Sequence, residues 1–164
     1  MILDNFTLLS GSVSAAGVLS GQLLTANSTL SANTLDVGPL SIGGNQAGDI
    51  GAGNPLEIEI SVLVAPTAVT DVTFQLVQAD DAALTSNLQV IGQTGAFPIA
   101  SLPAGTLVPL AINNAAPYAQ KRYVGVRYVA SGGTTLASMS VVAALAKDGQ
   151  DVKNLYFKSG FAVS

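Results

Sequence analysis

Alternating apolar and polar residues mark the first strand pair that the sequence predicts. In residues 56–62 (Leu-Glu-Ile-Glu-Ile-Ser-Val) every second side chain is apolar, and residues 72–76 (Val-Thr-Phe-Gln-Leu) repeat this period. Only an extended strand converts a period of two into one apolar and one polar face. Pro66 and Asp71 punctuate the short connection, so we expect two antiparallel neighbours. Their shared buried face would contain Ile58, Ile60, Val62, Phe74 and Leu76.

A second pair is predicted in the last third of the chain. Alternation in residues 123–129 separates two faces, with Val124, Val126 and Tyr128 on one and Tyr123, Gly125 and Arg127 on the other. Residues 131–135 (Ser-Gly-Gly-Thr-Thr) have the composition of a hairpin turn, because glycine adopts the positive φ that tight turns require. The partner strand would cover residues 137–145, with Met139, Val141, Ala143 and Leu145 facing inward.

Shorter apolar runs predict further strands near residues 34–37, 88–91 and 107–112. Pro109 lies inside the last of these runs and favours an edge strand, because proline cannot donate a ladder hydrogen bond. Residues 10–54 are rich in Ser, Gly, Ala, Asn and Thr and hold nine of the seventeen glycines. We therefore expect that region to be mostly loop.

Together these runs predict an all-β protein with about eight short antiparallel strands and almost no helix. Such a chain forms a β-sandwich, and a jelly roll is the commonest eight-stranded version. At 164 residues it has the length of one ordinary domain, which can bury a sizeable core without disulfides or metal. The expected organisation is a single domain over residues 1–164, with an N-terminal arm (1–9), a Gly/Ser-rich loop region (10–54) and an extended C-terminal tail (148–164).

Composition argues against an enzyme. The chain contains no Cys, His or Trp. Thiol chemistry, the usual acid and base near neutral pH, and the commonest metal ligand are thus missing together. We expect no catalytic residues, no cofactor and no metal. Only 10% of residues are charged, so much of the surface must be nearly neutral and suited to being covered by a partner.

The few charges are unevenly placed. Residues 1–120 contain eight acidic and no basic residues, whereas residues 121–164 contain six basic and two acidic ones. Either these charges are solvated with some internal pairing, or a basic end docks on an acidic neighbour such as another copy. Nucleic acid is not an expected partner, because the net charge is −4 and the basic residues do not cluster beyond Lys121 and Arg122.

Several other classes are disfavoured. The first 20 residues lack the basic start of a signal peptide, and the longest apolar run, residues 141–146, is far too short for a membrane helix. The Gly-rich residues 43–53 are followed by Asn54 and Pro55, where a phosphate-binding loop needs Lys and Ser or Thr. Asp80 and Asp81 follow a predicted strand end, where we expect a turn or a cap.

Both ends of the chain are candidate contact segments. The arm either folds back on its own sheet or reaches a neighbouring subunit. The tail mixes aromatic and basic residues, which either pack on the sandwich or form a contact surface, since aromatics beside cations are enriched at interfaces. The candidate contacts with a neighbouring subunit or another partner are Ile2, Leu3, Phe6, Lys153, Tyr156, Phe157, Lys158 and Phe161.

Short segments along the whole chain carry a family resemblance. They are Met1-Ile2-Leu3-Asp4, residues 33–38, 49–53, 93–95, 122–125, 147–148, 150–151 and 159–163. In their order and spacing the chain resembles the small capsid cement, or decoration, proteins of tailed bacteriophages related to the Bordetella phage type. It differs from them by being longer and richer in Gly and Ser between Leu9 and Gly48.

The resemblance implies a jelly-roll, homo-oligomeric protein, a dimer or trimer, made in the bacterial cytoplasm and bound to the capsid exterior. It implies the major capsid protein as partner, with contacts between shell subunits stabilised, and it implies no catalytic residues. Many weak contacts on a lattice add up to strong binding, which agrees with the unreactive composition. The alternative is a receptor- or carbohydrate-binding jelly roll of a tail or spike. Against it, sugar binders stack rings on exposed Trp or Tyr, and this chain has no Trp and four Tyr.

Overall fold

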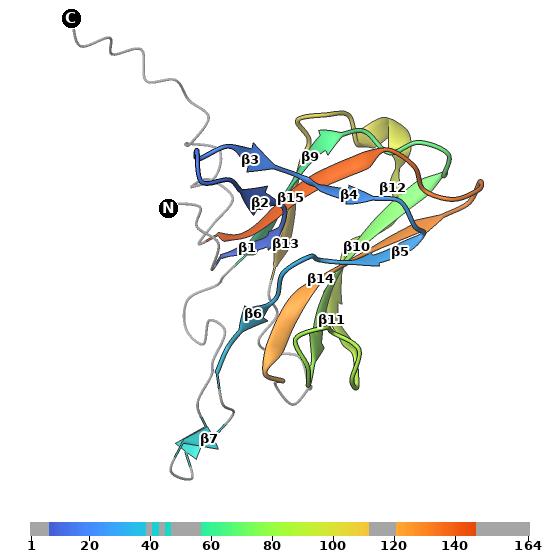
Figure 1. The fold of residues 1–164 in the computed structure, drawn as a ribbon. Helices are drawn as coiled ribbons and strands as arrows, with labels where there is room; N and C mark the ends of the chain where they lie inside the picture. Colours follow the sequence, from blue (N-terminus) through green and yellow to red (C-terminus); the bar gives the residue numbers. More distant parts are fainter. Residues whose placement is uncertain (1–6, 39–40, 43–44, 47–56, 112–120, 147–164) are drawn as a thin grey trace, which may run out of the picture.

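Two antiparallel β-sheets pack face to face in the computed structural model, as Figure 1 shows. The structure describes residues 7–38, 41–42, 45–46, 57–111 and 121–146. Strands dominate these residues, and the one described helix is a single 3-10 turn, η1 (Ile99–Ser101). The all-β, antiparallel fold class predicted from the alternating patterns is confirmed.

The first sheet, called here the β9 sheet, is built around two long strands. Its strand order is β1 (Leu8–Ser10), β15 (Met139–Ala146), β9 (Glu57–Val64) and β13 (Leu107–Ala111), and β4 (Gln22–Leu24) pairs with β15 beside β1. Pro109 lies in β13, which has no second neighbour among the described strands. The edge position predicted from that proline is therefore confirmed.

The second sheet, called here the β10 sheet, is also built around two long strands. Its order is β11 (Gln89–Gln93), β10 (Asp71–Ala79), β14 (Tyr123–Ser131) and β5 (Ser28–Leu30), with β12 (Phe97–Pro98) beside β10 and β6 (Leu35–Asp36) beside β14. Two separate hairpins are formed by β2 (Ser12–Val13) with β3 (Leu19–Ser20) and by β7 (Ser41–Ile42) with β8 (Asn45–Gln46).

The main core lies between the two sheets and contains the side chains that alternation predicted. Ile58, Ile60 and Val62 from β9 are 0–1% exposed, and Phe74 and Leu76 from β10 are fully buried. The predicted inward residues of β14 and β15 are buried in the same cluster, except Leu145, which is partly buried against it. The ring of Phe74 meets the rings of Phe97 and Tyr128 edge to face, each at 6.0 Å between centroids.

The pairing predicted within each strand pair is wrong. β9 and β10 were expected to be hydrogen-bonded neighbours, yet β9 pairs with β13 and β15, and β10 pairs with β11, β12 and β14. Likewise β14 and β15 do not form the predicted hairpin and belong to opposite sheets. Both connections cross from one sheet to the other, so the buried faces of each pair oppose one another across the core.

The β9–β10 and β14–β15 connections are hydrogen-bonded to each other at one end of the sandwich. Thr67 and Ala137 form an isolated antiparallel bridge, and Thr134 N–H donates to the Ala68 carbonyl at 2.9 Å. Gly132 and Gly133 adopt the positive φ expected for the turn, at 68° and 69°. The glycines are therefore needed for a crossing rather than for a hairpin.

The region predicted to be mostly loop contains several short strands. β2 to β8 all lie within residues 10–54, where one strand near residues 34–37 was expected and is present as β6. The end of the predicted arm folds onto its own sheet, because Leu8 and Leu9 are buried and β1 pairs with β15. Residues 1–6 and the tail from residue 147 onward lie outside the described residues.

Candidate interaction surface

The contact residues expected from sequence cannot be placed on the sandwich. All eight of them, in residues 1–6 and 153–161, lie outside the described residues. A candidate surface must therefore be sought on the described sheets, from side chains whose exposure and neighbours are known. Apolar side chains left in solvent are the most informative, because large exposed apolar patches mark interaction sites.

The exposed large hydrophobic side chains of the described residues come from just two segments. Val18, Leu19 and Leu23 precede or occupy β4, and their exposed fractions are 59%, 36% and 61%. Leu63 and Val64 end β9, with exposed fractions of 41% and 47%. Segments about 40 residues apart in sequence thus contribute all of the large apolar exposure in the described part of the chain.

Strand register brings Leu23 and Val64 together. Ser140 of β15 lies opposite Leu23 on one side and opposite Val64 on the other. Residues directly opposite in an antiparallel pair project to the same face, so the three form one row across β4, β15 and β9. The register shift lies in β9: Val141 pairs with Val62 and Ser140 with Val64, so Leu63 is an extra residue and Val64 turns to the outer face beside Ser140.

Gly21 allows the two segments to approach closely. A Cβ at Gly21 would meet Ser140 Oγ and would lie 2.9 Å from Leu63 Cδ1. The Leu63 side chain therefore covers the glycine beside the row. We define the apolar patch as Leu23, Leu63 and Val64, and Val18 and Leu19 extend the exposed apolar residues along the chain.

Part of this outer face is covered by the chain itself. Leu8, Val142 and Ala144 form a small buried cluster, and Val13 of the β2–β3 hairpin packs against it. Gly11 fits beneath this hairpin, since a Cβ there would lie 2.7 Å from the Ser20 carbonyl oxygen. The apolar patch thus lies beside a part of the face that is already used for packing.

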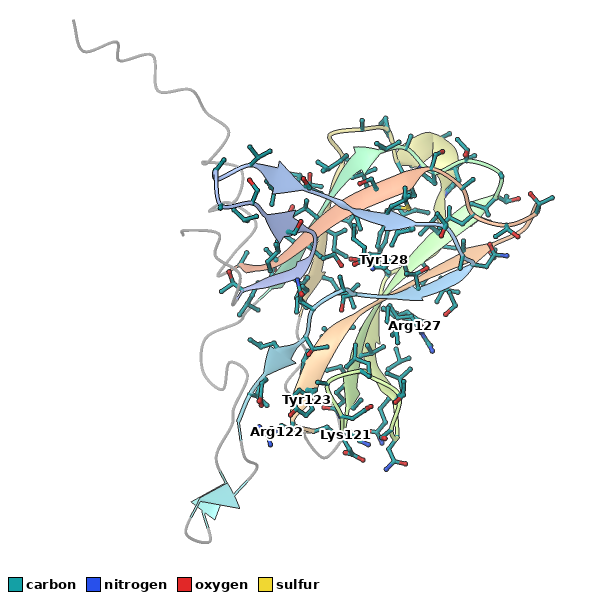
Figure 2. All side chains as sticks on the ribbon, viewed as in Figure 1. Lys121, Arg122, Tyr123, Arg127 and Tyr128 are labelled. Carbon is teal, nitrogen blue, oxygen red and sulfur yellow. The ribbon has the colours of Figure 1, made fainter. Side chains whose placement is uncertain are left out.

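Basic residues at the start of β14 are paired within the molecule. Arg122 donates from Nε and Nη2 to the two carboxylate oxygens of Asp36 at 2.9 and 2.8 Å. These bonds and one from the Gly38 N–H hold the pKa of Asp36 at about 2. Lys121 Nζ lies 3.2 Å from Asp80 Oδ1 and donates to the Asn87 carbonyl at 2.6 Å. Figure 2 shows Lys121, Arg122 and Tyr123 close together at the start of β14.

Of the two sequence interpretations of the basic end, internal pairing therefore accounts for Lys121 and Arg122. Arg127 differs, because its Nε donates to the side-chain amide oxygen of Gln75 at 2.7 Å rather than to a carboxylate. Lys147, Lys153 and Lys158 lie outside the described residues.

The acidic pair after β10 forms a turn, as predicted. Asp81 accepts hydrogen bonds from the N–H and hydroxyl of Thr85 and from the Ser86 N–H, at 2.6–2.8 Å. The pKa values of Asp80 and Asp81 are both lowered, chiefly by side-chain hydrogen bonds from Asn87 and Thr85 respectively. Within the described ranges no three acidic, His or Cys residues group to hold a metal.

The described tyrosines do not form a sugar-stacking platform. Tyr128 is fully buried in the core, and its hydroxyl lies 2.7 Å from Ser10 Oγ. Tyr123 is partly buried, with the Arg122 guanidinium 5.1 Å from its ring centroid. Tyr118 and Tyr156 lie outside the described residues. No described helix is long and apolar enough to cross a membrane.

Comparison with known protein families shows which family the chain belongs to. Residues 18–143 match the family model named Bbp16, which is more than half of the chain. The chain belongs to the Bbp16 family. This agrees with the resemblance to Bordetella phage proteins, although the Bbp16 description states no role. No curated protein matches the chain.

The Bbp16 match covers the candidate surface. It begins at Val18, the first of the exposed large hydrophobic residues, and ends at Ala143 in β15. The long strands β9, β10 and β14, the first five residues of β15 and the entire apolar patch lie within it. The sequence-predicted contacts in the arm and tail lie outside the Bbp16 match as well as outside the described residues.

Sequence reasoning missed the apolar patch for an identifiable reason. Leu23 lies in the region predicted to be loop, and Leu63 and Val64 end a strand whose other apolar residues face the core. One local signal was present: the apolar pair Leu63 and Val64 breaks the alternation of β9. Its meeting with Leu23 depends on pairing through β15 and is invisible in either segment alone.

Proposed function

We propose that this Bbp16-family chain is a structural virion protein that binds the outer surface of a bacteriophage capsid. It would stabilise contacts between major capsid protein subunits without any catalytic role. The observation that carries the proposal is the concentration of exposed large apolar side chains in one place on an otherwise weakly charged sandwich. A protein that adds contact area to a shell needs such a surface and needs no reactive group.

The strand order supports a jelly-roll assignment for the sandwich. Counting β1, β5, β9, β10, β11, β13, β14 and β15 as strands one to eight gives sheets ordered 1-8-3-6 and 5-4-7-2. This order interleaves early and late strands in both sheets, as expected when one long antiparallel pair is rolled up into two Greek keys. The proposed partners are the major capsid protein and further copies of the chain, as a dimer or trimer on the capsid exterior.

The copy number in purified phage particles tests the location. A cement role predicts a ratio near one copy per major capsid subunit, measured by quantitative mass spectrometry of intact particles. A handful of copies per particle would contradict the role and favour a receptor- or carbohydrate-binding module of the tail or spike.

A surface variant tests the apolar patch itself. Leu23→Gln replaces the most exposed of the large apolar side chains with a polar one of similar size. We expect it to weaken binding to particles that lack the chain by roughly tenfold, since burying one leucine contributes about 1.5–3 kcal/mol. Ala83→Gln, at an exposed position in the connection after β10, is the matched control and should bind normally. Equal binding by both variants would exclude the patch as the capsid contact.

A further inference from the structure

Three polar side chains form a continuous row on the outer face of the β10 sheet. Gln75 of β10 lies directly opposite Gln93 of β11 on one side and Arg127 of β14 on the other. Their strand neighbours Phe74, Leu76 and Val126 are in the main core, so Gln75 and Arg127 project away from it. Figure 2 shows Arg127 leaving β14 on the side of β10, away from the sandwich interior.

Hydrogen bonds in this row all run in one direction. Arg127 Nε donates to Gln75 Oε1 at 2.7 Å, and Gln75 Nε2 donates to Gln93 Oε1 at 2.9 Å. A guanidinium group has donors and no acceptor, so it requires an amide oxygen from Gln75. That requirement turns the Gln75 nitrogen toward Gln93 and the Gln93 oxygen toward Gln75. The cation therefore fixes the orientation of both amides.

The exposed side of this row therefore carries hydrogen-bond donors that are available to a partner. Each amide oxygen of the row already accepts a hydrogen bond, whereas the two terminal guanidinium nitrogens of Arg127 and the amide nitrogen of Gln93 have no partner among the described residues. Lys121 and Arg122 both contact a carboxylate, so Arg127 is the described cation that lacks one. A lone guanidinium fork held in place by its neighbours is suited to a bidentate carboxylate contact.

No acidic side chain in the neighbouring rows of the β10 sheet lies next to the Arg127 guanidinium. The adjacent row toward the start of β10 is Thr73 opposite Val129, and Asp71 lies four residues from Gln75 along the strand, about 13 Å at the rise of an antiparallel strand. On the other side, Leu84 packs over Gly125, where an added Cβ would lie 2.5 Å from its Cδ1. The row is therefore bounded by neutral side chains.

We propose that the row formed by Arg127, Gln75 and Gln93 docks an acidic segment of the capsid shell protein. A carboxylate of that segment would receive the Arg127 fork. A second acceptor, about 10 Å away across two strand spacings, would receive the Gln93 amide. This inference rests on the proposed capsid-binding function and names a second contact, on the opposite sheet from the apolar patch.

The shell protein fits this role better than a second copy of the chain. Asp71 and Glu57 are half-buried in their strands, and three further carboxylates of the described part are already engaged: Asp36 by Arg122, Asp80 by Lys121, and Asp81 by Thr85 and Ser86. Redirecting any of them to Arg127 of another copy would break an existing pair. A partner with uncommitted carboxylates has no such cost.

Arg127→Met tests the inference, because it removes the fork and keeps an unbranched apolar stem over the sheet. The probe is the purified phage particle from which the chain has been stripped, titrated with wild-type or variant protein at 50 and 300 mM NaCl. We expect Arg127→Met to bind about fivefold to tenfold more weakly at low salt and to lose most of the salt dependence seen with the wild type. Arg127→Lys should recover little, because lysine lacks the fork.

The matched control is Arg122→Met, which removes an arginine that is already paired within the molecule. It should leave both the affinity and its salt dependence unchanged. If Arg127→Met fails to fold by circular dichroism, Gln93→Leu at the exposed end of the row supplies the test and should weaken binding about threefold.

The outcomes separate this inference from the proposed function. Normal binding by Arg127→Met, with wild-type salt dependence, overturns the acidic docking site and leaves the capsid role standing. No binding by the wild type to stripped particles overturns the capsid role itself. A change of oligomer mass in Arg127→Met with unchanged particle binding, measured by analytical ultracentrifugation, also overturns the inference, because the row would then join copies of the chain.

Discussion

The hydroxyl of Tyr128 makes a buried bond that ties β1 of one sheet to β14 of the other. Tyr128 and Ser10 are both fully buried, and their oxygens lie 2.7 Å apart. Burial raises the pKa of Tyr128 well above its ordinary value of 10.0, so the hydroxyl stays neutral and can bond Ser10 at any ordinary pH. The bond adds specificity to a core that is otherwise apolar.

Tyr128→Phe removes this bond and leaves the Ser10 hydroxyl buried without a partner. We expect the free energy of unfolding to fall by about 1–3 kcal/mol, measured by urea denaturation. The double variant with Ser10→Ala removes both polar groups, so it should be less destabilised than the sum of the two single variants. Strict additivity would mean that the two hydroxyls contribute independently.

Gly125 is needed for space and not for backbone conformation. Its φ is not positive, but a Cβ would lie 2.5 Å from Leu84 Cδ1 and 2.7 Å from Ser31 Oγ. We expect Gly125→Ala to destabilise the protein by about 1–3 kcal/mol through displacement of Leu84. Gly95→Ala is the control, since nothing lies within 4 Å of a Cβ at that position, and its unfolding midpoint should match the wild type in the same urea titration. If Gly125→Ala is as stable as the wild type, Leu84 and the connection after β10 can move aside without a loss of stability.

At the scale of elements, the strands of the sandwich were predictable and their partners were not. Alternation identified β9, β10, β14 and β15 and most of their inward side chains, because burial of one face determines which positions are apolar. The same burial results whether two strands lie side by side or face each other across a core. Apolar patterning therefore could not distinguish the hairpin predicted at residues 131–135 from the observed crossing.

The candidate surfaces were predictable to a similar degree. Alternation correctly placed Arg127 away from the core, but its link to Gln75 depends on the β10–β14 register, which spans about 50 residues of sequence. The short strands β2 to β5 carry too few residues for a period to be visible, and β4 contributes Leu23 to the apolar patch. Long-range pairing, rather than local propensity, determines both sites.

One side chain links the crossing between β14 and β15 to β5. Asn27 Nδ2 donates to the Thr134 carbonyl at 3.0 Å, and Asn27 Oδ1 accepts from the Leu136 N–H at 2.7 Å. The Asn27 carbonyl also accepts from the Ala130 N–H, so the residue bonds both ends of the crossing. Asn27 thus supplies hydrogen bonds that a neighbouring strand supplies elsewhere in the sheets.

We expect Asn27→Ala to loosen this crossing more than it weakens the whole fold. The Leu136 N–H would lose its acceptor, so its hydrogen exchange should accelerate by roughly tenfold or more, as measured by NMR. Amides in the middle of β10 should keep their protection and serve as the internal reference. Uniform acceleration across both sheets would instead show that the crossing unfolds only with the entire sandwich.

At the scale of the whole molecule, the paired carboxylates make stability depend on pH in an acidic window. The chain has no His, so no side chain with an ordinary pKa near neutrality is present. Three carboxyl groups, Asp36, Asp80 and Asp81, have lowered pKa values in the folded protein, and that of Asp36 falls from 3.8 to about 2. The unfolded chain therefore binds more protons than the folded protein between those two values.

Because the unfolded state takes up protons first, acid should destabilise the protein as pH falls from about 4 to 2, while stability between about pH 5 and 8 stays nearly flat. Thermal unfolding midpoints at half-unit pH intervals would measure this. Asp36→Asn removes the titrating group, and Arg122→Met removes the main cause of its lowered pKa, so both variants should lose less stability across the window. If wild type and variants share one acid slope, the Asp36–Arg122 pair at the start of β14 contributes nothing to folding.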